Sequence, residues 1–246
     1  MSDPIQMPEL MRPDGRGPVV LACEHASNAF PVPWGDLGLD AGARAAHIAW
    51  DPGARGVAAR LSERLDAVLV AGTASRLIYD CNRPPEAPDA VLAFSEATAV
   101  PGNAGLSDAA RRARAAAIHA PFHAALAAAL DARPSPVLVT VHSFTPVYLG
   151  RPRGTEIGIL HDADARLADA MLAAAPAGRR VARNDPYGPA DGVTHTLRRH
   201  ALPGGRLNVM LEIRNDLIAD APAEAAMGDL LADWLTAALE DARCSA

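Results

Sequence analysis

The chain has 246 residues, 50% of them hydrophobic, and a formal net charge of -6. This length and composition are enough for one sizeable core, and the acidic balance gives no sign of nucleic-acid binding. All 23 basic residues are arginines, which excludes Schiff-base chemistry and the P-loop motif because both require a lysine.

No apolar run approaches the roughly 18 residues of a membrane span. Residues 1–17 contain no apolar segment of the signal-peptide kind. The three cysteines show no CxxC spacing and suit a reducing compartment. We therefore expect a cytoplasmic protein without a membrane partner.

Apolar runs and amphipathic segments alternate along the chain. We expect strands at 19–23, 67–71, 77–81, 136–142, 156–160, 179–184 and 207–213. Helices are expected to start at Asp51-Pro52 and Ser107-Asp108, where a capping residue stands first, and to span 164–175, 191–201 and 222–242. Pro121 is expected to kink or split the second of these helices. This alternation predicts an α/β fold with a mixed or largely parallel sheet. Residues 1–17 are interpreted as a flexible arm, and 18–246 as a single domain.

Three of the expected strands carry polar side chains at or near their ends. His25 follows the first strand, His142 ends the fourth, and Glu212 lies within the last. Ligands of open α/β sheets bind at the carboxyl ends of the strands, so these side chains are expected to converge. The pattern indicates a metal-dependent hydrolase.

Metal binding is expected at His25 and His142. Hydrolytic zinc sites typically have three protein ligands and one open position for water. From the residues themselves, the third ligand stays open among four side chains near in sequence: Glu24, Asn28, His47 and Asp51. Asp51 is also the expected helix N-cap.

Glu212 stands in an otherwise apolar strand, where a carboxylate is costly unless it is paired or used. Its functional interpretation is a general base that activates water. Its structural interpretation is a salt bridge to Arg214, two residues on and on the same face of the strand.

Arginine is suited to bidentate binding of a substrate carboxylate. Arg83 follows an expected strand, and Arg76 could polarise a carbonyl or pair with an acid. His119 and His123 are four residues apart but lack the glutamate of an HExxH motif, and we interpret this pair as structural. Three further histidines have no partner that the sequence identifies: His161, His195 and His200.

Five segments together resemble the N-formylglutamate amidohydrolase family. They occur in the family's order and span most of the chain: Glu24–Asn28, His47–Ala54, Ser75–Pro84, Val141–Ser143 and Leu211–Arg214. The resemblance implies a three-layer α/β/α sandwich around a mixed, largely parallel sheet, of the phosphorylase/hydrolase-like and zinc carboxypeptidase-like type. The domain over 18–246 would then be an α/β hydrolase domain.

The resemblance also implies the roles of individual residues. One divalent metal, with zinc expected, is assigned to His25, Asp51 and His142, and Asp51 is chosen because Asn28 stands where the carboxypeptidase pattern has a glutamate. Glu212 is assigned as the general base and Arg76 as the group that offsets the oxyanion. Substrate binding is assigned to four residues: Asn82, Arg83, Ser143 and Arg214.

The implied reaction is hydrolysis of the amide of N-formyl-L-glutamate, or of a related N-acyl acidic amino acid, to release formate or another acid. The family connects the chain with histidine degradation, although the sequence itself does not identify the pathway. Two alternatives stay open. One is another acyl-amino-acid deacylase or small carboxypeptidase on the same scaffold, and the other is a protein that binds an acidic amino acid without turnover.

Overall fold

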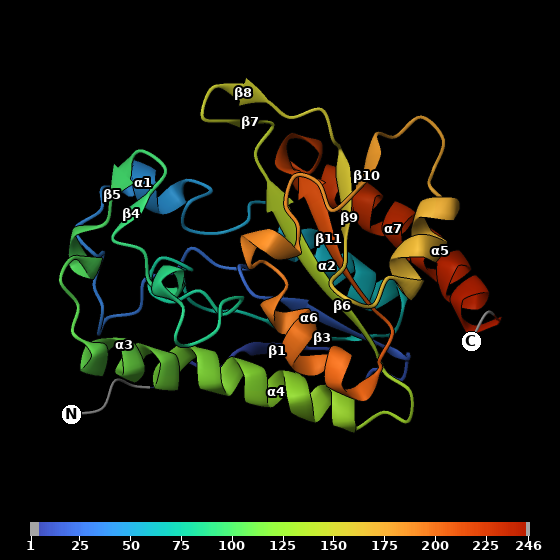
Figure 1. The fold of residues 1–246 in the computed structure, drawn as a ribbon, viewed down its shortest axis with the longest axis horizontal. Coiled ribbons are helices and arrows are strands. Elements are labelled where there is room, and N and C mark those ends of the chain that lie inside the picture. The colour runs from blue at the N-terminus through green and yellow to red at the C-terminus, as the bar shows by residue number, and fades with distance from the viewer. Residues whose placement is uncertain (1–4, 245–246) are drawn as a thin grey trace.

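The computed structural model describes residues 5–244, and a mixed sheet of seven strands forms the centre of this part of the chain (Figure 1). The strand order is β1-β3-β2-β6-β11-β9-β10. The sheet is parallel from β3 through β2 and β6 to β11. At its two sides, β1 pairs antiparallel with β3, and β9 pairs antiparallel with β11. The expected mixed and largely parallel sheet is confirmed.

The strands of this sheet range from three residues in β1 to eight in β6. Their bounds are β1 Glu9–Met11, β2 Val19–Cys23, β3 Val68–Ala71, β6 Val137–Phe144, β9 Ile157–Leu160, β10 Val181–Arg183 and β11 Asn208–Arg214. Two small hairpins lie outside the sheet: β4 Phe94–Ser95 with β5 Thr98–Ala99, and β7 Val147–Tyr148 with β8 Arg151–Pro152. Strand β1 forms one edge of the sheet and lies within residues 1–17, the segment interpreted as an arm. Residues 1–4 of that segment lie outside the described residues.

Helices cover both faces of the sheet and complete the α/β sandwich (Figure 1). Their bounds are α1 Ala41–Ala45, α2 Ala54–Arg64, α3 Asp108–Arg114, α4 Ala120–Asp131, α5 Arg166–Ala173, α6 His195–His200 and α7 Ala221–Cys244. The core on one face contains residues of α2, α5 and α7, and the core on the other contains residues of α4 and α6. Among residues 5–244, no helix has the length and apolar character that crossing a membrane requires.

The alternation of side chains along the strands separates the two cores. In β6, Val139 and Val141 face α2 and α7, while Leu138 faces α4. His142 has the parity of Leu138, and the register pairs it with Glu212 of β11. The two polar side chains therefore share the α4 and α6 side of the sheet.

Pro121 does not end its helix. An α-helical Pro121 would leave the carbonyl of Ala117 without its donor, because proline has no N–H. The chain widens into a π turn over Ala115–His119 just before this point, and the backbone N–H of Gln6 donates to the Ala117 carbonyl at 2.8 Å. The helical path from α3 to α4 thus continues past the proline (Figure 1).

Two predictions about the neighbourhood of the site are wrong. Residues 77–81 form a turn and loop rather than a strand. Asp51 does not cap a helix: α2 begins at Ala54, with Gly53 as its N-cap. Gly53 has a φ of 79°, which lets the chain turn sharply into α2 while the Asp51 carboxylate points towards the sheet.

Candidate active site

Three buried side chains from distant parts of the chain converge at the carboxyl end of the sheet. The Asp51 Oδ2 atom lies 3.2 Å from Nδ1 of His25 and 2.9 Å from Nδ1 of His142. One ligand atom from each of the three lies within 4.8 Å of the others. Two imidazole nitrogens and one carboxylate oxygen form a donor set typical of catalytic zinc.

The second ring nitrogen of each histidine faces another carboxylate. His25 Nε2 lies 2.8 Å from Asp80 Oδ1, and His142 Nε2 lies 3.2 Å from Glu24 Oε2. A carboxylate facing the outer nitrogen is common among metal-ligating histidines, because it orients the ring and keeps the proton on that nitrogen when an ion is bound. The His25–Asp80 contact is a hydrogen bond, whereas His142 and Glu24 form an ion pair: His142 Nε2 and both Glu24 oxygens have no hydrogen-bond partner within the described part of the chain. The donor set therefore fits a metal ion by its supporting contacts as well as by its ligands.

Charge is concentrated in this group. Burial opposes the ionisation of Asp51, but His25 and His142 outweigh it and hold the pKa of the Asp51 carboxyl well below its ordinary value. Burial likewise opposes protonation of His142, but Glu24 and Asp51 outweigh it and raise the pKa of His142 well above its ordinary value. The site thus attracts positive charge, which protons supply in the metal-free protein and a divalent ion can replace.

Glu212 lies beside these three residues, and its pKa is raised whereas that of Asp51 is lowered. Its side chain is buried, and its Oε2 atom has no hydrogen-bond partner within the described part of the chain. Burial raises the pKa of Glu212 to about 7, against an ordinary value of 4.5. Glu212 forms no salt bridge with Arg214, because Arg214 pairs with Asp216, Nε to Oδ1, at 2.7 Å.

A cavity of about 240 Å³ opens over these residues. This volume is just below the roughly 300–1,000 Å³ of drug-sized pockets, so it suits a small molecule. Its lining includes the three converging residues, Glu212 and two arginines, Arg76 and Arg83. Arg76 donates to Asp80 Oδ2 at 2.8 Å, and Arg83 donates to Asp89 Oδ2 at 2.6 Å.

A family model for N-formylglutamate amidohydrolase matches residues 17–219, which is most of the chain. The chain belongs to the N-formylglutamate amidohydrolase family. A comparison with curated proteins finds no match.

Two solved structures are similar to this chain over nearly its whole length. The crystal structure of gene product Atu2144 from Agrobacterium tumefaciens has 53% sequence identity and a TM-score of 0.92, and 96% of each chain is covered. The N-formylglutamate amidohydrolase from Ralstonia eutropha JMP134 has 20% identity and a TM-score of 0.62, with 97% of this chain and 98% of that chain covered. The second comparison shows the shared fold.

Of the other residues to which substrate binding is assigned, two line the cavity and one does not. Asn82 and Ser143 line it, but the Asn82 amide already bonds to Val193 O and Thr196 N, and the Ser143 hydroxyl donates to Pro52 O at 2.7 Å. Arg214 is not among the lining residues.

Three alternatives to Asp51 as the third ligand are engaged elsewhere. Asn28 donates to the carbonyl of Arg44, and His47 pairs with Glu96 at the cavity rim. Glu24 lies on the outer side of His142.

Asp80 is a functional candidate that the sequence interpretation did not single out. It is buried, accepts from Arg76 and from the backbone N–H of Asn82, and faces His25. The cost of burying a carboxylate among Leu77, Ile78 and Tyr79 could have identified it, by the same reasoning that identified Glu212.

Proposed function

We propose that the chain is a metal-dependent amidohydrolase that cleaves N-formyl-L-glutamate or a closely related N-acyl acidic amino acid. The observation that carries this proposal is the position of Asp51 Oδ2, which lies at 3.2 and 2.9 Å from His25 Nδ1 and His142 Nδ1 inside a small cavity that Glu212 also lines. Membership of the family supports the reaction class.

His25, Asp51 and His142 would hold the metal ion, and zinc is the expected ion because the donors are two imidazoles and one carboxylate. When bound, the ion lowers the pKa of water and polarises the carbonyl of the scissile amide. Asp80 and Glu24 keep the two imidazoles oriented.

Glu212 acts as the general base and then as the general acid. Its carboxylate takes a proton from the attacking water as the new C–O bond forms at the formyl carbon. It then returns that proton to the leaving nitrogen as the C–N bond breaks, which yields formate and the free amino acid. A pKa near 7 suits a group that must both accept and donate a proton at neutral pH.

Two arginines provide the positive charge that an acidic substrate requires. Arg83 lines the cavity and binds the α-carboxylate, while Arg76, beside Asp51 and Asp80, offsets the negative charge that develops on the carbonyl oxygen. Asn82 positions this loop through its two amide contacts.

A substrate panel tests this function. The zinc-loaded protein is assayed for amine release from N-formyl-L-glutamate, N-formyl-L-aspartate, N-formyl-L-leucine, N-acetyl-L-glutamate and N-succinyl-L-glutamate. The proposal expects the highest kcat/KM for an N-formyl acidic amino acid. Preference for N-acetyl or N-succinyl substrates would assign the chain to another deacylase activity. Binding of N-formyl-L-glutamate without turnover of any member would contradict an enzymatic function.

A further inference from the structure

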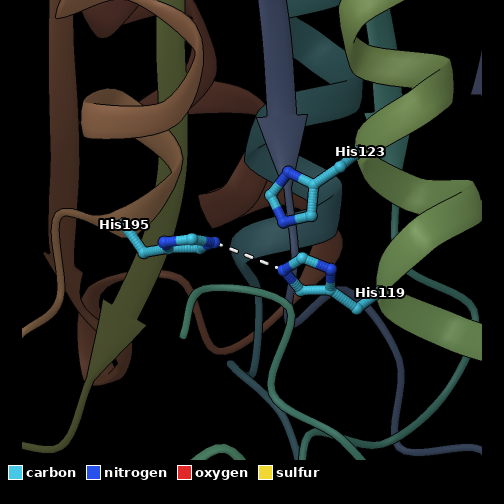
Figure 2. Close-up of side chains that lie close together, drawn as sticks. All are labelled: His119, His123 and His195. Atoms are coloured by element: carbon cyan, nitrogen blue, oxygen red, sulfur yellow. Dashed lines mark hydrogen bonds between the residues drawn. The ribbon is translucent and has the colours of Figure 1, made fainter. Parts of the chain in front are cut away.

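A second group of imidazoles lies on the α4 and α6 side of the sheet. His119 ends the π turn, His123 lies one turn later in α4, and His195 begins α6 (Figure 2). One ring nitrogen from each of the three lies within 4.8 Å of the others. His200 stacks on His123 with ring centroids 5.0 Å apart. The structure thus supplies the partners of His195 and His200 that the sequence does not identify.

The spacing of the ring nitrogens suits a metal ion. His119 Nε2 and His195 Nε2 face each other at 3.2 Å (Figure 2). Two nitrogen ligands at about 2.0–2.1 Å from a tetrahedral zinc ion are about 3.3 Å apart, so this pair needs little adjustment to share an ion.

The tautomer of His123 is also fixed by its surroundings. Its Nε2 atom lies 2.9 Å from the carbonyl oxygen of Cys81. A carbonyl oxygen only accepts, so Nε2 must carry the proton and Nδ1 must present its lone pair. His200 Nε2 lies 2.8 Å from Nδ1 and donates to it, so the nitrogen of His123 that faces His119 and His195 is Nε2 (Figure 2). An ion shared by the three histidines would replace the proton on Nε2 and its bond to Cys81 O, and the proton on Nδ1 would then be donated to His200.

The electrostatic surroundings keep these rings in the metal-binding form. Burial lowers the pKa of His119 to about 4 and that of His123 to about 2, so both are neutral at pH 7. Burial also lowers the pKa of His195 and Arg199 lowers it further, while Glu24 and Asp80 act in the opposite direction. Neutral imidazole is the form that ligates a metal ion.

The group is accessible and is linked to the candidate active site. A cavity of about 420 Å³ is lined by His119, His123 and His200, which gives an ion a route from solvent. Cys81, whose carbonyl accepts from His123, stands between Asp80, which faces His25, and Asn82, which bonds to Val193 and Thr196 at the start of α6. Elements α4 and α6 therefore hold this loop from two sides.

We propose that His119, His123 and His195 form a second metal site, which binds a zinc-class transition-metal ion and joins α4 to α6 behind the loop over Asp80–Arg83. The ion is a structural one in this proposal: it fixes the position of the loop and takes no part in the reaction. Imidazole donors without a thiolate or carboxylate select zinc, copper or nickel over magnesium and calcium.

Zinc stoichiometry in single and double variants tests the proposal. The full chain is stripped with a chelator, titrated with Zn²⁺ alone, desalted and analysed for metal content, and its thermal midpoint is recorded with and without Zn²⁺. His195→Gln removes one ligand from a half-buried position, His142→Ala removes one ligand of the candidate active site, and His161→Gln is the matched control because His161 belongs to neither group.

We expect two equivalents of zinc per chain in the unmodified protein and in His161→Gln, and one in His195→Gln and in His142→Ala. The double variant, which combines His195→Gln with His142→Ala, should bind none. Zn²⁺ should raise the thermal midpoint of His142→Ala but not that of the double variant. His119→Gln serves as a second variant if His195→Gln does not fold. Equal zinc content in His142→Ala and the double variant would overturn the second site. One equivalent that is lost in His195→Gln but kept in His142→Ala would support the second site and contradict the proposed active-site metal.

Discussion

His25 and Asp80 are joined by a contact of 2.8 Å between Nε2 and Oδ1, although 55 residues separate them in the sequence. This contact turns the other ring nitrogen of His25 towards Asp51. Asp80 Oδ2 also accepts a hydrogen bond from Arg76 Nη2 at 2.8 Å. One buried carboxylate therefore orients a proposed metal ligand and a proposed oxyanion-stabilising group.

Asp80→Asn should therefore weaken zinc binding at the active site by about 10- to 100-fold, because an amide supports the imidazole less well and directs an N–H₂ group towards Arg76 or His25. Zinc affinity is measured by competition with a chelator in a His195→Gln background, which removes the second proposed site. Asp14→Asn, at an exposed aspartate outside both groups, is the control. An unchanged affinity in Asp80→Asn would show that Asp80 does not support the site.

Glu212→Gln should lower kcat by about 10² to 10⁴, because glutamine keeps the size of the side chain but cannot accept a proton. KM for N-formyl-L-glutamate and zinc content should change little, since Glu212 is not proposed as a ligand. A kcat within a few-fold of the unmodified enzyme would exclude Glu212 as the general base.

The same substitution has a distinct effect on the stability of the metal-free protein. The pKa of Glu212 in the fold is about 7, above its ordinary 4.5, so the fold binds this proton more tightly than the unfolded chain does. The resulting stabilisation is complete below the unfolded pKa and is lost as the pH rises through 7. Glu212→Gln should therefore raise the thermal midpoint at about pH 8 more than at about pH 5. A lower midpoint at about pH 8 would indicate a structural ion pair instead.

The sequence predicts this site well where the chemistry follows a buried strand. His142 and Glu212 share a register position on neighbouring parallel strands, and both stand out because the residues around them are apolar. The burial of each polar side chain could be inferred from its apolar neighbours, whereas the face that the two side chains share depends on the register between the strands, which the structure supplies.

The sequence is less informative where the outcome depends on contacts between distant segments. Pro121 predicts a kink or split of its helix, and the α-helix is interrupted by the π turn over Ala115–His119. The donation from Gln6 to Ala117 O, which satisfies the freed carbonyl, comes from more than a hundred residues away and could not be predicted. Asp51 followed by a proline predicts a helix cap, whereas its actual contacts are with His25 and His142, which lie 26 and 91 residues away in the sequence. The approach of His195 to His119 depends on how α6 packs beside α4, which no local pattern encodes.

Arg83→Lys should raise KM for N-formyl-L-glutamate by about tenfold or more with a smaller effect on kcat, because an ammonium cannot keep the contacts of Nε with Asp89 and of Nη1 with Gly192 while it also binds a carboxylate. The split between KM and kcat is measured by steady-state kinetics, with Arg112→Lys, at a solvent-facing position of α3, as the control. An unaltered KM would remove Arg83 from the substrate site.

Gly53→Ala should destabilise the fold and disturb the active site together. A Cβ atom at Gly53 would lie 2.4 Å from the carbonyl oxygen of Ile218, in addition to the cost of about 1–2 kcal/mol for a left-handed alanine. Gly178 has a similar φ of 81° with no neighbour within 4 Å of the added atom, so Gly178→Ala isolates the conformational cost. Chemical unfolding and zinc affinity are compared for the two variants. Equal losses of stability, with zinc affinity kept in both, would show that Gly53 is not needed to position Asp51.

We propose that hydrolysis depends on a metal ion held by His25, Asp51 and His142. This dependence is tested by the rate of formate release from N-formyl-L-glutamate by the unmodified chain and by His142→Ala, each measured after chelation and again after Zn²⁺ is restored. A bound ion supplies several kcal/mol of transition-state stabilisation, so we expect chelation to reduce the rate at least about 100-fold, Zn²⁺ to restore it in the unmodified chain, and His142→Ala to stay inactive in both states. Full activity in protein shown by elemental analysis to contain no metal would mean that hydrolysis does not depend on a metal ion.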